Sequence, residues 1–120
     1  MADTRTRVLG LEVTLPIRVE SVANKREHWA VKARRTQTHR HLACALTPYH
    51  PLPVIVTITR IAPRELDDDN LRSGFKAIRD GIADRLGVDD RDKRVEWRYA
   101  QAKGKPHEYA AHVKLEPKGE

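Results

Sequence analysis

The feature that most constrains the fold of this chain is an apolar stripe with helical spacing in its second half. Apolar side chains recur there at steps of four, three, four and four, at Leu71, Phe75, Ile78, Ile82 and Leu86. Such steps place the side chains on one face of an α-helix, which must be buried against another part of the fold. Asp69 or Asn70 can cap its start, and Gly87 is a typical stop. We therefore predict a helix over residues 71–86.

Strands are predicted on both sides of this helix. From Leu9 to Val19 every second residue is apolar, which is the period of a strand with one buried face. Residues 54–61 are dense in β-branched side chains, as strands are, and Pro63 ends this segment. Alternation over residues 95–99 and 109–115, with Lys103, Gly104, Lys105 and Pro106 near a turn, predicts a hairpin.

A second helix is predicted over residues 24–47, which contain no Gly or Pro. Its apolar face is thin and consists of Trp29, Ala33, Leu42 and Leu46. Trp29, Trp97 and Phe75 are expected in the core. The order strand, helix, strand, helix, strand, strand predicts an α+β fold, with a mixed sheet of about four strands packed against two helices. A chain of 120 residues has room for one compact domain, over residues 1–120.

The composition bounds the class of partner and the compartment. Lys and Arg outnumber Asp and Glu by 23 to 17, and the net charge of +6 favours polyanionic partners. The single cysteine, Cys44, excludes an internal disulfide, and with His39 and His41 it offers too few donors for a typical zinc site. No apolar run is long enough to span a bilayer or to form a signal peptide. We expect a soluble protein of the cytoplasm.

Acidic residues gather in two groups that border the predicted 71–86 helix, namely Asp67-Asp68-Asp69 and Asp89-Asp90. If residues 66–69 are extended, Asp67 and Asp69 point to one side. Clustered carboxylates repel one another unless a cation neutralises them, and oxygen ligands favour Mg²⁺ or Mn²⁺. Asp90 supplies a third carboxylate only if the fold brings its loop beside Asp67.

The acidic turn is also compatible in type with a structural turn or a calcium loop. A solvated turn with a helix cap explains many Asp-rich segments and stays open. An EF-hand calcium loop is excluded, because Leu71 and Arg72 follow Asn70 and no glutamate closes the loop. Lys76 and Asp80 are spaced for an ion pair on the helix surface, although Lys76 could instead stabilise charge on a phosphate.

These motifs together resemble the RusA-type Holliday junction resolvases. The similarity lies in Asp67-x-Asp69-Asn70-Leu71, in Lys76 and Asp80, in Gly87-Val88-Asp89-Asp90 and in Arg94-Val95-Glu96-Trp97. The stretch from Leu15-Pro16 to Asn24, followed by His28-Trp29, is also similar, so most of the chain is covered.

The resemblance implies a homodimer that nicks four-way DNA junctions symmetrically with Mg²⁺ or Mn²⁺, in recombination and repair. It places the metal on Asp67, Asp69 and Asp90, and many family members belong to phages or prophages. It also implies a lysine three residues after Asn70, where this chain has Ser73. Lys76 is assigned that role because its spacing to Asp80 is that of the family, with Arg72 as the alternative. Asp80, Asp89 and Asn70 are secondary candidates.

Basic residues crowd the predicted 24–47 helix. Lys25, Lys32, Arg35 and His39 would share one face at helical spacing, as a stripe for phosphates. The candidate DNA-binding residues are Lys25, Arg26, Lys32, Arg34, Arg35, Arg40 and Lys103. The first hypothesis for function is a branched-DNA endonuclease in a bacterial or phage-infected cell. The alternative is a non-catalytic basic DNA-binding protein whose acidic turn is structural.

Overall fold

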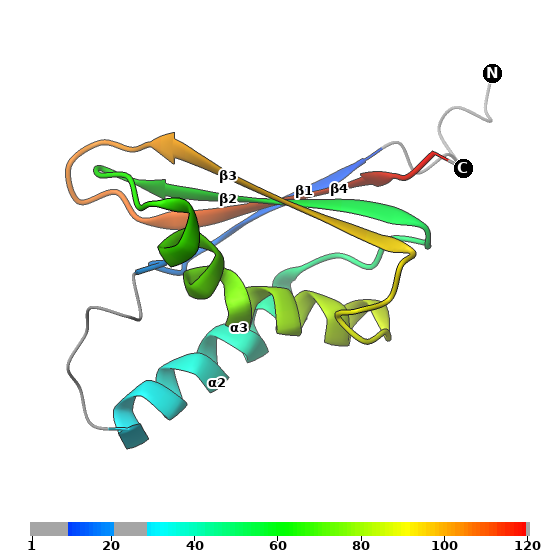
Figure 1. The fold of residues 1–120 in the computed structure, drawn as a ribbon, viewed down its shortest axis with the longest axis horizontal. Helices are drawn as coiled ribbons and strands as arrows, with labels where there is room; N and C mark the ends of the chain where they lie inside the picture. The colour runs from blue at the N-terminus through cyan, green and yellow to red at the C-terminus, as the bar shows by residue number, and fades with distance from the viewer. Residues whose placement is uncertain (1–9, 21–28, 120) are drawn as a thin grey trace.

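The computed structural model describes residues 10–20 and 29–119 of the chain. Its elements, in chain order, are β1 (Leu11–Leu15), α2 (Trp29–Leu46), β2 (Val54–Ala62), α3 (Asp68–Leu86), β3 (Val95–Lys103) and β4 (Ala110–Pro117). Both helices lie on one face of the sheet (Figure 1). The predicted α+β fold with a four-stranded mixed sheet and two helices is confirmed. No helix among the described residues is long and apolar enough to cross a membrane.

The strands are ordered β1-β4-β2-β3 across the sheet. β2 pairs with β3 in parallel, with Val54 opposite Val95, and α3 is the connection that parallel neighbours need. β4 pairs antiparallel with both β1 and β2. The predicted hairpin of the last two strands is therefore wrong, because β2 lies between them. Alternation of apolar residues identified both strands correctly, but it carries no information on which strand lies beside which.

β1 is shorter than predicted. Leu9 lies outside the described residues, and pairing with β4 ends at Leu15, opposite Ala111. Pro16 follows directly and has no amide to donate to a ladder. Burial nevertheless continues at every second residue beyond the strand, since Ile17 and Val19 are buried in the core.

α3 carries the predicted apolar stripe, and every member of it is buried. The helix ends as predicted at Gly87, whose φ of 73° is in the left-handed region. The predicted cap is wrong by two or three residues, because Asp67 is the N-cap and its Oδ1 accepts a hydrogen bond from the Asn70 amide. Asp68 and Asp69 are already helical, so the extended alternation assumed for residues 66–69 does not hold.

α2 contributes little to the core and packs chiefly against α3. Ala43 is its one buried residue, and it faces Gly81 of α3, where an added Cβ would lie 2.8 Å from the Ala43 Cβ. Residues 24–28 of the predicted helix lie outside the described residues. Trp29 was expected in the core but is 75% exposed, because the first turns of α2 extend beyond α3 (Figure 1). Phe75 is fully buried, and Trp97 packs against the core while half-buried.

Candidate functional site

The segment that leads into Asp67 is held by side chains from the sheet. Gln101 accepts a hydrogen bond from the Leu66 amide (2.9 Å) and donates one to the Leu66 carbonyl (2.7 Å). Arg60 donates to the carbonyl oxygens of Arg64 and, at 2.8 Å, Val19. Both backbone groups of Leu66 are thus paired by one side chain, which fixes the residue before the helix cap.

These two positioning residues were missed by sequence reasoning. Arg60 shares the inward-facing positions of β2 with Val54, Val56 and Ile58, and it is only 7% exposed. Burial lowers the pKa of its guanidinium. A charged residue in the apolar register of a strand is a usable signal, because a buried cation must find hydrogen-bond acceptors. Gln101 gives no comparable signal, because polar residues are common at strand ends.

Asp90 is held in place by hydrogen bonds to its backbone. Its carbonyl oxygen accepts hydrogen bonds from Arg79 Nη2 (2.9 Å) and from the Trp97 indole (3.3 Å). The Arg79 guanidinium also lies over the Trp97 ring, 4.8 Å from its centre, and donates to the Tyr99 hydroxyl (2.7 Å). Arg79 therefore ties the loop after α3 to both α3 and β3. It too was missed, since its role depends on a loop that returns to the helix.

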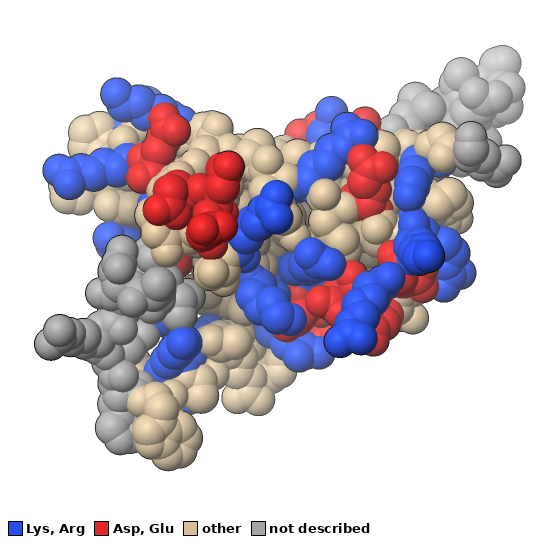
Figure 2. Space-filling view, in the orientation of Figure 1, with Lys and Arg blue, Asp and Glu red and all other residues tan. Residues whose placement is uncertain are grey.

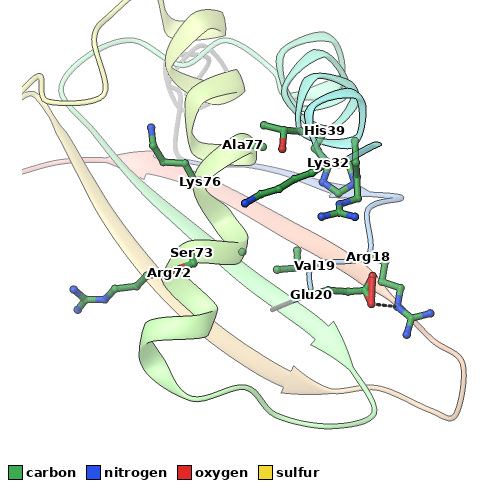
Figure 3. Close-up of a pocket in the computed structure, with 12 residues that line it drawn as sticks. Arg18, Val19, Glu20, Lys32, His39, Arg72, Ser73, Lys76 and Ala77 are labelled. Atoms are coloured by element: carbon green, nitrogen blue, oxygen red, sulfur yellow. Dashed lines mark ion pairs between the residues drawn. The ribbon is translucent and has the colours of Figure 1, made fainter. Parts of the chain in front are cut away.

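Lys76 lies between two carboxylates. Its Nζ contacts Asp80 Oδ1 at 2.9 Å, which confirms the ion pair predicted from the spacing. The same Nζ is 3.8 Å from Asp90 Oδ2, and Arg79 Nε is also 3.8 Å from that oxygen. Arg72, the alternative to Lys76, points away from α2 and from the other labelled side chains (Figure 3). The fold thus brings Asp90 beside Lys76 and Asp80.

A hollow of 390 Å³ surrounds this cluster, which we call the acidic hollow. Its charged lining residues are Arg40, Lys76, Asp80, Asp84, Asp89 and Asp90. The Arg91 amide, and next the Asp90 side chain, lower the pKa of Asp89. Hydrogen bonds from Arg40, at 2.7 and 2.9 Å, lower the pKa of Asp84. The carboxylates of this hollow are therefore partly neutralised by the protein's own cations and amides.

Asp67 and Asp69 are not part of the acidic hollow. Figure 2 shows one acidic cluster over the start of α3 and another over its end and the following loop, with basic side chains between them. Asp69 and Lys76 are separated by about 10 Å of helical rise. Within residues 10–20 and 29–119, no three His, Cys, Asp or Glu side chains are grouped so that they could hold a metal ion.

The predicted DNA-binding residues are spread over α2 and the end of β3. Lys32 and Arg35 line a hollow between α2 and α3, whereas Arg40 is bound to Asp84. Arg34 on α2 and Lys103 at the end of β3 are exposed. Lys25 and Arg26 lie outside the described residues. α2 contains no acidic residue, and its cations lie between Lys32 and Arg40, with no basic residue in its last turn.

Comparisons with known proteins assign no family. No family model matches the chain. A protein of Xylella fastidiosa (strain Temecula1 / ATCC 700964), described as "Uncharacterized protein", is 61% identical over 33 residues, which are 28% of this chain and 20% of that protein. The chain therefore matches about a fifth of the length of this relative. Such a short match shows local sequence similarity and carries no activity with it.

Proposed function

We propose that this protein is a metal-dependent endonuclease that cuts branched DNA such as four-way junctions. The observation that carries the proposal is the return of the Asp90 loop to α3. It places the Asp90 carboxylate 3.8 Å from Lys76 Nζ. Lys76 lies in α3, the helix that also contains Asp69 and that Asp67 caps. The acidic groups before and after this helix are the part of the chain that resembles RusA-type resolvases.

Asp67, Asp69 and Asp90 are the residues proposed to hold Mg²⁺ or Mn²⁺. Their carboxylate oxygens are the donors these ions favour, and the cap bond to Asn70 occupies only part of the acceptor capacity of Asp67. A cation bound by all three would need them closer together than they lie in this structure. When bound, such a cation activates water and stabilises charge on phosphoryl oxygens.

Lys76 is proposed to stabilise the phosphate undergoing cleavage. Its side chain is 65% exposed, and its amine is held by Asp80 at the rim of the acidic hollow, where a phosphate oxygen can approach it. The basic surface of α2 is proposed to bind the DNA backbone without reading bases. Two symmetric nicks require two active sites, so the proposal includes a homodimer.

A non-catalytic DNA-binding protein is the second candidate. It is favoured by the structural role of Asp67, whose carboxylate caps α3, and by the distribution of the acidic residues into two clusters. Under this function the acidic turn serves the fold, while the basic helix α2 binds the duplex.

The deciding experiment compares a synthetic four-way junction with a linear duplex of the same sequence. Each is incubated with the protein in Mg²⁺, Mn²⁺ or EDTA, beside the variants Asp69→Asn and Asp90→Asn. Asp68→Asn is the matched control, because it removes the same charge from the same turn. Paired nicks that require metal, Asp69 and Asp90 but tolerate Asp68→Asn are expected.

Other results replace the proposal with defined alternatives. Junction binding without cleavage under every metal would establish the non-catalytic function. Cleavage of both substrates alike would keep the metal chemistry but remove the preference for branched DNA. Thermal unfolding with and without Mg²⁺ is an independent check, because a cation that binds only the folded protein raises its melting temperature.

A further inference from the structure

A hollow of 680 Å³ lies between α2, α3 and the segment Arg18–Glu20, and we call it the α2–α3 pocket (Figure 3). It adjoins the acidic hollow, because Lys76 lines both. Its charged or titratable lining residues are Arg18, Glu20, Lys32, Arg35, His39, Arg72 and Lys76. Five of these side chains are cationic and one is a carboxylate, so the lining carries a large excess of positive charge.

The cationic charge facing the inside of the pocket comes mainly from α2. Glu20 lies 3.4 Å from Arg18 and neutralises it at the rim. Lys76 directs its amine toward Asp80, and Arg72 points outward (Figure 3). Lys32 instead reaches from α2 toward α3 (Figure 3). Arg35 follows one turn farther along α2 and also lines the pocket. Because α2 contains no acidic residue, it supplies no carboxylate to offset these charges.

The opposite wall of the pocket is built from small residues. Ser73, Gly74 and Ala77 of α3 line it, and none has a side chain long enough to fill the space. At Gly74 the helix touches the Arg18–Glu20 segment, since an added Cβ would lie 2.7 Å from Val19 Cγ1 and 3.0 Å from the Glu20 carbonyl oxygen. A larger residue at this position would push the two walls apart. The contact at Gly74 thus closes the base of the pocket.

The pKa of the His39 imidazole is sensitive to the charge within the pocket. It lies on α2, one turn beyond Arg35, and is half-buried. Burial lowers the pKa of its imidazole, the charge of Arg35 lowers it further, and Glu20 acts in the opposite direction. A bound anion would oppose the effect of Arg35, so it would raise the pKa of His39.

We infer that the α2–α3 pocket binds a phosphate group of a nucleic-acid strand, through Lys32, Arg35 and His39. The inference rests on the proposed function for its ligand, because DNA is the phosphate source that function supplies. The volume of 680 Å³ falls in the range of about 300–1,000 Å³ typical of small-molecule sites, which is room enough for a phosphate and its attached sugar. The strand would then be held beside α3, next to Lys76, which also lines the acidic hollow.

The test measures binding and the titration of His39 in EDTA, where no cleavage occurs. The probes are inorganic phosphate, a short single-stranded oligonucleotide and the same oligonucleotide with a 5′-phosphate. NMR follows the imidazole of His39 as the pH is varied. The variants are Lys32→Gln and Arg35→Gln. Arg98→Gln is the control, since Arg98 alternates with Tyr99, which stacks on Phe75, and so lies on the face of the sheet away from the helices.

Both oligonucleotides are expected to raise the pKa of His39. Lys32→Gln and Arg35→Gln should each weaken oligonucleotide binding by about tenfold, which is the effect of losing one charge-assisted hydrogen bond. Arg98→Gln should leave the affinity unchanged. A thermal melt of each variant confirms that the fold is intact.

Three outcomes would overturn the inference. The first is an affinity that falls equally in Lys32→Gln and Arg98→Gln, and the second is a His39 titration that no probe shifts. The third is a pKa of His39 that inorganic phosphate raises but neither oligonucleotide does, which would assign the pocket to a free anion. Because these measurements are made without metal, a protein that never cleaves DNA but binds oligonucleotides here would refute the proposed nuclease and leave the pocket standing.

Discussion

Replacing Gln101 with leucine is expected to loosen the start of α3. Leucine has a similar size, so the change removes hydrogen bonds without creating a large cavity. The lost bonds are those to the Leu66 amide and carbonyl, at 2.9 and 2.7 Å. At about 1 kcal/mol each, the free energy of unfolding should fall by about 2 kcal/mol. For a domain of this size the melting temperature should fall by about 8 °C.

The variant Gln101→Glu distinguishes the contributions of the two hydrogen bonds to Leu66. A carboxylate still accepts from the Leu66 amide, but it cannot donate to the Leu66 carbonyl. It also brings a negative charge near the buried guanidinium of Arg60, whose Nη1 lies 3.5 Å from Gln101 Oε1. We therefore expect Gln101→Glu to lose about 1 kcal/mol or less, roughly half the effect of leucine.

Urea unfolding followed by circular dichroism measures both variants, and amide hydrogen exchange measures the local effect. In Gln101→Leu the amides of Leu66 and Asn70 should exchange faster, because one has lost its acceptor and the other depends on the Asp67 cap. Suppose that the free energy of unfolding of Gln101→Leu lies within about 0.5 kcal/mol of the parent value and that both amides exchange at the parent rate. Gln101 then does not position the start of α3.

Three further predictions test the packing of the helices. Phe75→Ala should lower the free energy of unfolding by about 3–5 kcal/mol in urea titrations, and a loss below about 1 kcal/mol would contradict the complete burial of the ring. Gly81→Ala should cost about 1–3 kcal/mol, because the added Cβ meets the Arg40 carbonyl oxygen; an unchanged melting temperature would show that α2 shifts freely. The Arg40 hydrogen bond lowers the pKa of Asp84 below 3.8, so the stability from this pair is complete above that pH and is lost as the pH falls through the folded-state pKa. The difference in unfolding free energy between the parent and Arg40→Gln should therefore shrink from pH 6 to about pH 2, and a constant difference would refute the assignment.

Much of the fold could be predicted because burial imposes a period on the sequence. The stripe from Leu71 to Leu86 has one period that fits a helix, and the alternation in β2 fits a strand. Strand order has no such signature. β3 and β4 both alternate, yet one is parallel to β2 and the other antiparallel, a result of the α3 crossover and of the connection after β3.

The candidate site was less predictable because it depends on single residues and tertiary contacts. The pair of Lys76 and Asp80 follows from helical spacing alone, and it was found. The direction of Asp69 depends on where α3 begins, and a shift of two residues in the cap changes it from extended to helical. The contacts of Gln101 with Leu66 and of Arg79 with Asp90 join segments that no local pattern connects.

The backbone of Asp90 is held more firmly than its carboxylate. The backbone is fixed by two hydrogen bonds to its carbonyl oxygen, from Arg79 and Trp97. The carboxylate contacts the Asp89 side chain and forms 3.8 Å ion pairs with Lys76 and Arg79, and partly exposed pairs of this kind contribute less than about 1 kcal/mol. Under the proposed function, a cation or a phosphate can therefore compete for Asp90 or for Lys76 at little cost and without unfolding the loop. Under the same proposal, this competition would let Lys76 be paired with carboxylates in the free protein and still meet a substrate phosphate.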